Sequence, residues 1–98
     1  MHAIVNTMKL ARPLPPELLL KMEQELLPRC RELDPALTIK IVQVTETDLV
    51  MIAFYSSRDK LDEVSSKLAG PWFGENVRSY LAGPVNRLVG EVIADFKA

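Results

Sequence analysis

Cysteine and histidine are almost absent from this chain of 98 residues, which contains one of each, Cys30 and His2. A lone cysteine cannot form a disulfide within the chain, and it cannot supply a Cys-x-x-Cys metal or redox motif. Cys30 and His2 are also far apart in sequence, so no metal-binding cluster is predicted. These absences predict a chain without a resident metal that is suited to the reducing cytoplasm.

An excess of basic residues is also missing. Twelve lysine and arginine residues against thirteen aspartate and glutamate residues give a net charge of −1. Proteins that bind nucleic acid usually carry a basic excess that releases counterions from phosphates. We therefore expect no nucleic-acid partner.

Long apolar runs and glycine-rich loops do not occur. No stretch approaches the roughly 20 apolar residues of a membrane-spanning helix, and the N-terminus lacks the basic and apolar regions of a signal peptide. The sequence contains neither a phosphate-binding glycine loop nor a Gly-x-Ser-x-Gly elbow. No membrane association and no nucleotide cofactor are predicted.

What is present is the composition of a globular protein. Apolar residues make up 48% of the chain and charged residues 26%, which is ordinary for a folded domain. The length corresponds to one domain. We expect residues 1–98 to form a single domain.

Residue periodicity predicts four strands and two main helical regions. Strands are indicated by side chains that alternate between two faces, and helices by apolar residues at helical spacing. The expected order is strand 3–10, helix 16–33, strand 37–44, strand 49–55, a helix from Ser56 to about Leu68, a short helical piece over 72–81 and strand 86–96.

Prolines and glycines predict where these elements are interrupted. Pro28 predicts a kink or a fresh start in the first helix. The two Leu-Ala-Gly-Pro sequences, at 68–71 and 81–84, predict helix ends with a glycine in left-handed geometry. Ser56 begins a Ser-x-x-Asp pattern typical of a helix start, and Gly90 indicates a bulge or a close approach in the last strand.

The order of elements predicts an α+β fold, the ferredoxin-like βαββαβ arrangement with a four-stranded antiparallel sheet and helices on one face. Two helices cover only one face of such a sheet. The strands carry apolar residues on both faces, and an apolar uncovered face predicts a partner. We expect a homodimer in which two sheets pack face to face.

The order and lengths of the elements, and the stretch from Trp72 to Leu81 before a strand that begins near Arg87, resemble the dimeric α/β-barrel superfamily and, within it, the antibiotic-biosynthesis-monooxygenase-like group. The resemblance covers most of the chain. It implies a cavity between sheet and helices beside an aromatic-bearing short helix. Relatives that degrade haem place a histidine ligand after the tryptophan-bearing segment, and this chain has none there.

The resemblance points to Asn6, Trp72 and Arg87 as catalytic residues, because oxygen-using relatives line the cavity with an asparagine, a tryptophan and sometimes an arginine. Their role would be to hold a phenolic substrate and to stabilise its anion while oxygen attacks. Asn6 alternatively is a rim residue of an apolar strand face with structural hydrogen-bond partners. Alternatively, Arg87 is a charged residue that keeps an edge strand from pairing with another chain, or it forms a salt bridge at the rim of a dimer.

The aromatic residues of the same region are candidates for substrate binding. Trp72 forms either a wall of a flat pocket or part of the core. Phe73 and Tyr80 are expected to contact substrate, or alternatively to pack in the core. The same two alternatives apply to Tyr55. Cys30 lies on an apolar helix stripe and is expected to be an inert buried thiol.

Two functions from different classes remain. The first is a cofactor-independent monooxygenase that acts on a small hydroxylated aromatic, needs no flavin or metal, and draws its electrons from the substrate. The second is a non-catalytic small-molecule-binding or assembly module. Binding of RNA through the open sheet is disfavoured, because Phe54 and Tyr55 point to opposite faces and do not form a stacking platform.

Overall fold

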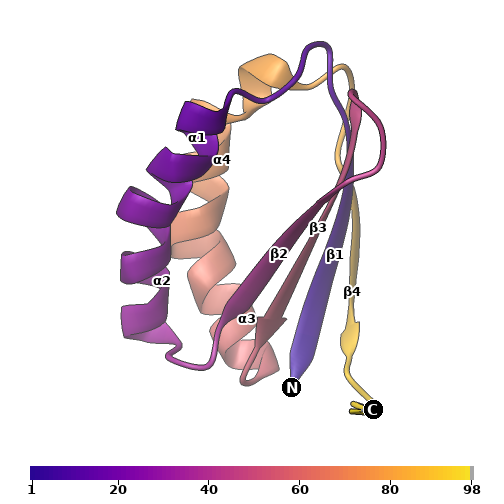
Figure 1. Cartoon of the computed structure of the whole chain (residues 1–98). Helices are drawn as coiled ribbons and strands as arrows, with labels where there is room; N and C mark the ends of the chain where they lie inside the picture. The colour runs from indigo at the N-terminus through magenta and orange to yellow at the C-terminus, as the bar shows by residue number, and fades with distance from the viewer. Residues whose placement is uncertain (98) are drawn as a thin grey trace.

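A computed structural model describes residues 1–97 as a four-stranded antiparallel sheet covered on one face by two long helical segments (Figure 1). The strands lie in the order β2-β3-β1-β4, and every neighbouring pair is antiparallel. This is the predicted ferredoxin-like α+β arrangement. The strands are β1 (His2–Lys9), β2 (Thr38–Gln43), β3 (Asp48–Tyr55) and β4 (Asn86–Glu91).

The first helical segment is continuous through Pro28. It consists of α1 (Pro16–Lys21), the π-helical turn η1 (Met22–Leu26) and α2 (Leu27–Leu33). The Leu27 N–H donates to the Met22 carbonyl five residues back, which widens the turn before the proline. A proline lacks the N–H and crowds the preceding carbonyl, and a π-turn relieves that crowding. The predicted fresh start is therefore replaced by a widened turn.

The second helical segment does not stop at Gly70-Pro71, so that prediction was wrong. It runs through α3 (Arg58–Val64), the π-helical turn η2 (Ser65–Ala69) and α4 (Gly70–Asn76), and a 3-10 turn, η3 (Arg78–Tyr80), follows. The Gly70 N–H donates to the Ser65 carbonyl, and Pro71 occupies the start of α4. A widened turn again accommodates the proline, where we had expected a helix end.

Two smaller predictions about caps were also wrong. Ser57, and not Ser56, caps α3, because the Lys60 N–H donates to Ser57 Oγ at 3.1 Å. Within residues 1–97 no glycine has positive φ, so neither Leu-Ala-Gly-Pro sequence ends a helix in left-handed geometry. The second sequence does end the helical region, since Leu81 bridges to Leu10.

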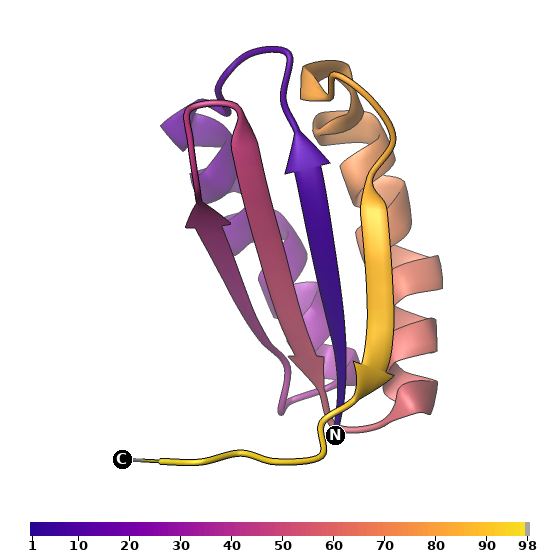
Figure 2. The same cartoon turned by 90° about the vertical axis from the view of Figure 1, so that its right-hand side faces the viewer.

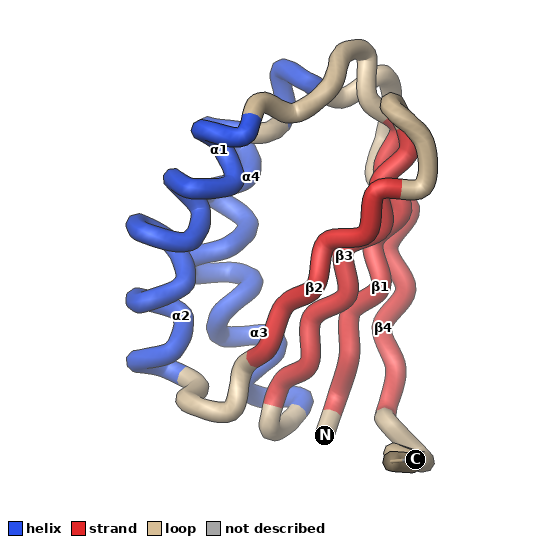
Figure 3. Tube along the Cα trace, viewed as in Figure 1, coloured by secondary structure: helices blue, strands red, loops and turns tan. Residues whose placement is uncertain are grey.

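The core lies between the sheet and the two helical segments (Figure 3). It is built from alternate residues of the strands and from the apolar stripes of both helical segments. Its most deeply buried side chains include Leu26, Cys30, Ala53, Leu61, Val64 and Val77. This packing holds one face of the sheet at a defined distance from the helices.

The last strand ends at Glu91 rather than at residue 96. Its register with β1 runs without a break to the pair His2↔Glu91. The Val92 N–H then donates to the Met1 carbonyl. Because Met1 is the first residue, β4 has no further partner in β1 beyond this point. The unbroken register also means that Gly90 forms no bulge. Residues 92–97 leave the sheet and run sideways past the ends of the other strands (Figure 2), and the side chains of Ile93 and Phe96 are each 93% exposed.

The face of the sheet that points away from the helices carries many apolar side chains. They include Val5, Val42, Val50, Ile52, Phe54 and Leu88. Val42 is 46% exposed and Leu88 is 59% exposed. We call this surface the open face.

None of the helices within residues 1–97 has both the length and the apolar character to cross a bilayer.

Candidate functional site

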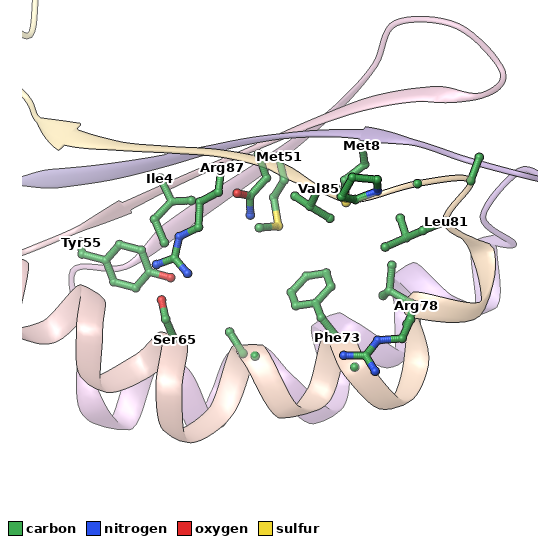
Figure 4. A pocket seen from close by; sticks show the side chains of 18 residues that line it. Ile4, Met8, Met51, Tyr55, Ser65, Phe73, Arg78, Leu81, Val85 and Arg87 are labelled. Atoms are coloured by element: carbon green, nitrogen blue, oxygen red, sulfur yellow. The ribbon is translucent and has the colours of Figure 1, made fainter.

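A cavity of about 670 Å³ lies between the helix-facing side of the sheet and the second helical segment (Figure 4). Its floor is formed by β1, β3 and β4, one wall by η2 and α4, and its rim by residues 81–85. Ligand pockets in proteins occupy about 300–1,000 Å³. The cavity is therefore large enough to hold a small organic molecule.

The floor is set by the two-residue period of the strands. Ile4, Asn6 and Met8 of β1 point toward the helices together with Met51 and Tyr55 of β3, as alternation along a strand requires. Most of this floor is apolar, so the polar groups that interrupt it will orient a ligand.

Asn6 lies on the floor of the cavity, between two neighbouring strands. It pairs with Met51 on one side and with Arg87 on the other. Its Oδ1 atom is buried and has no hydrogen-bond partner within residues 1–97. Since a buried acceptor without a partner is unfavourable, a ligand hydroxyl that donates to this oxygen would remove the penalty.

Arg87 points along the cavity toward Tyr55, and Ser65 faces Tyr55 from the opposite wall (Figure 4). Burial raises the pKa of the Tyr55 phenol, while the Ser65 hydroxyl and the Arg87 guanidinium oppose the rise. Tyr55 therefore keeps its proton at neutral pH and can donate it in a hydrogen bond. Together with Asn6, these groups form the polar end of the cavity.

Phe73 enters the cavity from α4, and Trp72 supports it from behind. The two rings lie edge to face, with centroids 5.6 Å apart and an interplanar angle of 82°. Trp72 is buried in the core, is not among the cavity-lining residues, and its Nε1 has no hydrogen-bond partner in the described part of the chain. The structure thus brings Asn6, Arg87 and Phe73 together and leaves Trp72 one layer away.

Tyr80 also lies away from the cavity lining. The Arg12 guanidinium stacks over its ring, 4.3 Å from the centroid, which is within the range of cation–π attraction. The Tyr80 carbonyl accepts from the Ala11 N–H at 2.8 Å, and the Ala82 N–H donates to the Lys9 carbonyl at 2.8 Å. Tyr80 therefore ties the rim segment to the end of β1.

Sequence reasoning missed several residues that line the cavity. They are Met8, Met51, Ser65 and Arg78. Met8 shares its strand face with Asn6, so alternation was a usable signal for it, and Met51 pairs with Asn6 across β1 and β3. Ser65 and Arg78 gave no such signal, because their positions depend on the helix that continues through Pro71.

The cavity offers no obvious proton acceptor. Its lining includes two arginines and a tyrosine but neither a carboxylate nor a histidine, and residues 1–97 contain no group of three or more potential metal ligands. Cys30 is fully buried in the core, where burial raises the pKa of its thiol and Arg29 opposes the rise. An anion would therefore be stabilised in the cavity, but a ligand would have to lose its proton without a basic side chain.

No protein-family model matches the sequence, and no curated protein matches it. Several solved structures share its fold, antibiotic biosynthesis monooxygenase-like proteins among them. A monooxygenase from the gene ActVA-Orf6 of Streptomyces coelicolor, in complex with nanaomycin D, matches with a TM-score of 0.70 and 17% identity over 99% of this chain and 91% of that chain. Antibiotic biosynthesis monooxygenase-like neighbours thus confirm the predicted resemblance at the level of fold.

Two further matches bear on chemistry and assembly. SnoaB, a cofactor-independent oxygenase from Streptomyces nogalater, matches with a TM-score of 0.61 and 11% identity over 99% of this chain and 97% of that chain. A dimeric ferredoxin-like protein from an uncultured marine organism matches with a TM-score of 0.66 and 14% identity over the whole of both chains. At these identities the likeness shows the fold alone.

Proposed function

We propose that this protein is a cofactor-independent monooxygenase that oxidises a flat hydroxylated aromatic molecule. The observation that carries the proposal is the cavity of about 670 Å³, with its apolar walls and the adjacent pair Asn6 and Arg87 at one end. Aromatic rings fit the apolar walls, and a hydroxyl group fits the polar end.

The reaction needs only the substrate and molecular oxygen. A phenol with hydrogen on the carbon opposite its hydroxyl reacts as its anion, which transfers electrons to oxygen. One oxygen atom becomes the second carbonyl of a para-quinone, and the other leaves as water with the two hydrogens that the phenol loses. Atoms and electrons balance, so neither a metal nor a flavin is required.

The chain supplies orientation and charge. The Arg87 guanidinium and the Tyr55 hydroxyl stabilise the phenolate as it forms, and Asn6 Oδ1 accepts a hydrogen bond from the substrate hydroxyl in the resting complex. Since the lining has no carboxylate or histidine, the substrate hydroxyl itself must be acidic, as it is in polycyclic phenols and anthrones. Phe73 stacks against the rings, and Trp72 positions Phe73.

The solved structures that share this fold support the chemistry. One neighbour is a monooxygenase solved with an aromatic ligand, nanaomycin D, and another is described as a cofactor-independent oxygenase. Both activities are known of those proteins, and they suggest where to begin the search for a substrate.

Oxygen uptake with dithranol, a dihydroxyanthrone, tests the proposal. We expect the wild-type protein to consume one oxygen molecule for each quinone formed, at a rate well above autoxidation in buffer. Catalase should return no oxygen, since water and not peroxide is the product. Arg87→Gln and Asn6→Ala should each lower the rate by about 10–100-fold, because each removes stabilisation of the developing anion.

Matched controls separate the site from general damage. Arg31→Gln and Gln24→Ala alter exposed side chains of the first helical segment and should leave the rate unchanged. Equal rates for the wild-type protein and the Arg87→Gln and Asn6→Ala variants would refute the site, and uptake no faster than in buffer would refute the oxygenase.

A second function, a non-catalytic small-molecule-binding module, is favoured by one observation. The cavity lining lacks the carboxylates and histidines that usually move protons in enzymes. This alternative predicts that hydroxylated aromatics raise the melting temperature while oxygen uptake stays at the level of autoxidation.

We further propose that the protein is a cytoplasmic homodimer joined through the open face. Apolar side chains such as Leu88 and Val42 are exposed there, and a neighbour of the same fold is described as dimeric. Burial of such a patch against a second copy would remove apolar surface from water. The single, fully buried thiol of Cys30 fits a reducing compartment.

A further inference from the structure

The cavity has an arginine near each of its two ends. Arg87 projects from β4 toward Tyr55, and Arg78 projects from the turn after α4, with the Phe73 ring between them in the view of Figure 4. The Arg78 guanidinium lies beside Gly74 of α4, since a β-carbon at residue 74 would be in ordinary van der Waals contact with it, at 3.8 Å. Two cations thus flank one apolar cavity.

Neither cavity arginine is neutralised by the described part of the chain. Five ion pairs occur within residues 1–97, and they involve Lys9, Lys21, Arg58, Lys60 and Lys67. The cavity lining contains no carboxylate. A local positive field therefore exists inside a chain whose net charge is −1, and such a field favours anionic ligands.

The two ends differ in what they can bind. At the Arg87 end, the buried Asn6 Oδ1 lacks a donor. A hydroxyl group supplies that hydrogen, whereas a carboxylate only accepts. Both arginines are exposed, but at the Arg78 end no cavity-lining atom of the described residues is a buried acceptor without a partner. A carboxylate there would match the planar guanidinium and remain partly hydrated.

We propose that the ligand is a hydroxylated aromatic acid, bound with its phenolic hydroxyl at Asn6 and Arg87 and with its carboxylate at Arg78. This inference rests on the proposed function, because it assumes that the same cavity holds the aromatic substrate. It adds the orientation of that substrate and a second anionic group that the oxidation itself does not need.

Binding of two product-like quinones tests the proposal independently of turnover. Danthron and rhein are dihydroxyanthraquinones that differ by a single carboxylate, and both can be titrated by the quenching of tryptophan fluorescence. We expect rhein to bind about fivefold more tightly, which corresponds to about 1 kcal/mol, as an exposed ion pair typically contributes. Arg78→Gln should abolish this preference and leave the affinity for danthron unchanged.

Other variants distinguish the two ends. Arg87→Gln should lower the affinity for both quinones by a similar factor. Arg31→Gln removes a charge from the surface of α2 and should change neither affinity. The preference for rhein should also shrink at high salt. Melting curves recorded for each variant ensure that only folded proteins are compared.

The outcomes separate this inference from the proposed function. Equal binding of rhein and danthron to the wild-type protein, or a preference that survives Arg78→Gln, would overturn the inference while the oxygenase assay with dithranol still stands. If dithranol is not oxidised but rhein binds more tightly than danthron and Arg78→Gln removes the difference, the oxygenase is refuted and the assignment of an aromatic acid is supported. Failure of both quinones to bind would overturn the inference together with the cavity on which the proposed function depends.

Discussion

At the scale of single residues, Asp34 shows how one buried carboxylate joins two elements. It is 1% exposed, its Oδ2 accepts from the Ser56 N–H at 2.9 Å and its Oδ1 from the Ala36 N–H at 3.3 Å. Ser56 lies in the turn between β3 and α3, while Asp34 ends α2. The helix expected over residues 16–33 ends just before Asp34, but the sequence pattern gives no sign of the contact with Ser56, which is 22 residues away.

Replacement of Asp34 by alanine should lower the free energy of unfolding by about 1–3 kcal/mol, since it leaves two partly buried backbone N–H groups without an acceptor. Urea denaturation monitored by circular dichroism measures the change. Asp95→Ala, in the exposed C-terminal segment, is the control and should shift stability by less than about 0.5 kcal/mol. Similar values for the two variants would contradict the role of Asp34.

Tyr55 gives the fold a dependence on alkaline pH. Its pKa is raised in the folded state, chiefly by burial, so the folded protein holds the phenolic proton more tightly than the unfolded chain, where the pKa is about 10. The stabilisation from this group is complete below about pH 10 and declines as pH rises from there through the folded-state pKa.

In Tyr55→Phe, the free energy of unfolding should fall less steeply between about pH 9.5 and 11 than in the wild-type protein, because no buried phenol remains to ionise. Urea denaturation at several pH values provides both curves, and the lysines contribute equally to each. Parallel curves would show that Tyr55 does not hold its proton as the structure implies.

At the scale of elements, the two π-turns decide where the cavity wall lies. Each turn precedes a proline, Pro28 or Pro71, and each allows its helix to continue. Because the second helical segment does not break at Pro71, α4 lies against the sheet and presents Phe73 and Gly74 to the cavity. If the helix ended at Gly70, the cavity would lack this wall.

Gly70→Ala tests the geometry of the second π-turn. A β-carbon at residue 70 would lie 2.7 Å from the Ser65 carbonyl oxygen, so the turn must shift. Overpacking typically destabilises by about 1–3 kcal/mol, and the gain in helix propensity offsets about 1 kcal/mol. We expect a net loss of up to about 2 kcal/mol in the free energy of unfolding, measured by urea denaturation.

Gly83→Ala is the control for this prediction, because no described heavy atom lies within 4 Å of a β-carbon at residue 83. It should be neutral or stabilise by about 0.4–1 kcal/mol through the unfolded state. If Gly70→Ala proves as stable as Gly83→Ala, the close approach to Ser65 does not constrain the turn.

At the scale of the whole molecule, two apolar surfaces that the described chain leaves uncovered bear on assembly. One is the open face, and the other is the extended segment 92–97, where Ile93 and Phe96 are almost fully exposed. Figure 2 shows this segment leaving the end of β4 and turning to run sideways below the ends of the other strands. Both features support the proposed homodimer, because a second copy could cover both surfaces.

Leu88→Glu should dissociate this dimer, since it places a charge within the apolar contact between the two open faces. Light scattering coupled to gel filtration should give twice the chain mass of 11.0 kDa for the wild-type protein and the chain mass for the variant. Leu20→Glu alters a leucine of α1 that is 51% exposed and should remain dimeric. A wild-type protein with the mass of a single chain would refute the dimer.

The sequence by itself determined the order of elements and hence the fold. Alternation along the first strand placed Asn6 on an apolar strand face, and the helical stripe that includes Cys30 indicated which side of the first helix is buried. These patterns are local, because each depends only on the period of a strand or a helix. Element ends were less accurate where pairing with a distant strand decided them, as at Glu91.

Only the tertiary structure decided which residues share the cavity. Arg87 joins Asn6 because of the register between β1 and β4, and Trp72 is placed behind Phe73 because α4 continues the second helical segment. Contacts of this kind depend on the packing of segments that are distant in the chain, and the period of a single element carries no information about them. The composition of the site is therefore a property of the fold, although each of its side chains can be read in the sequence.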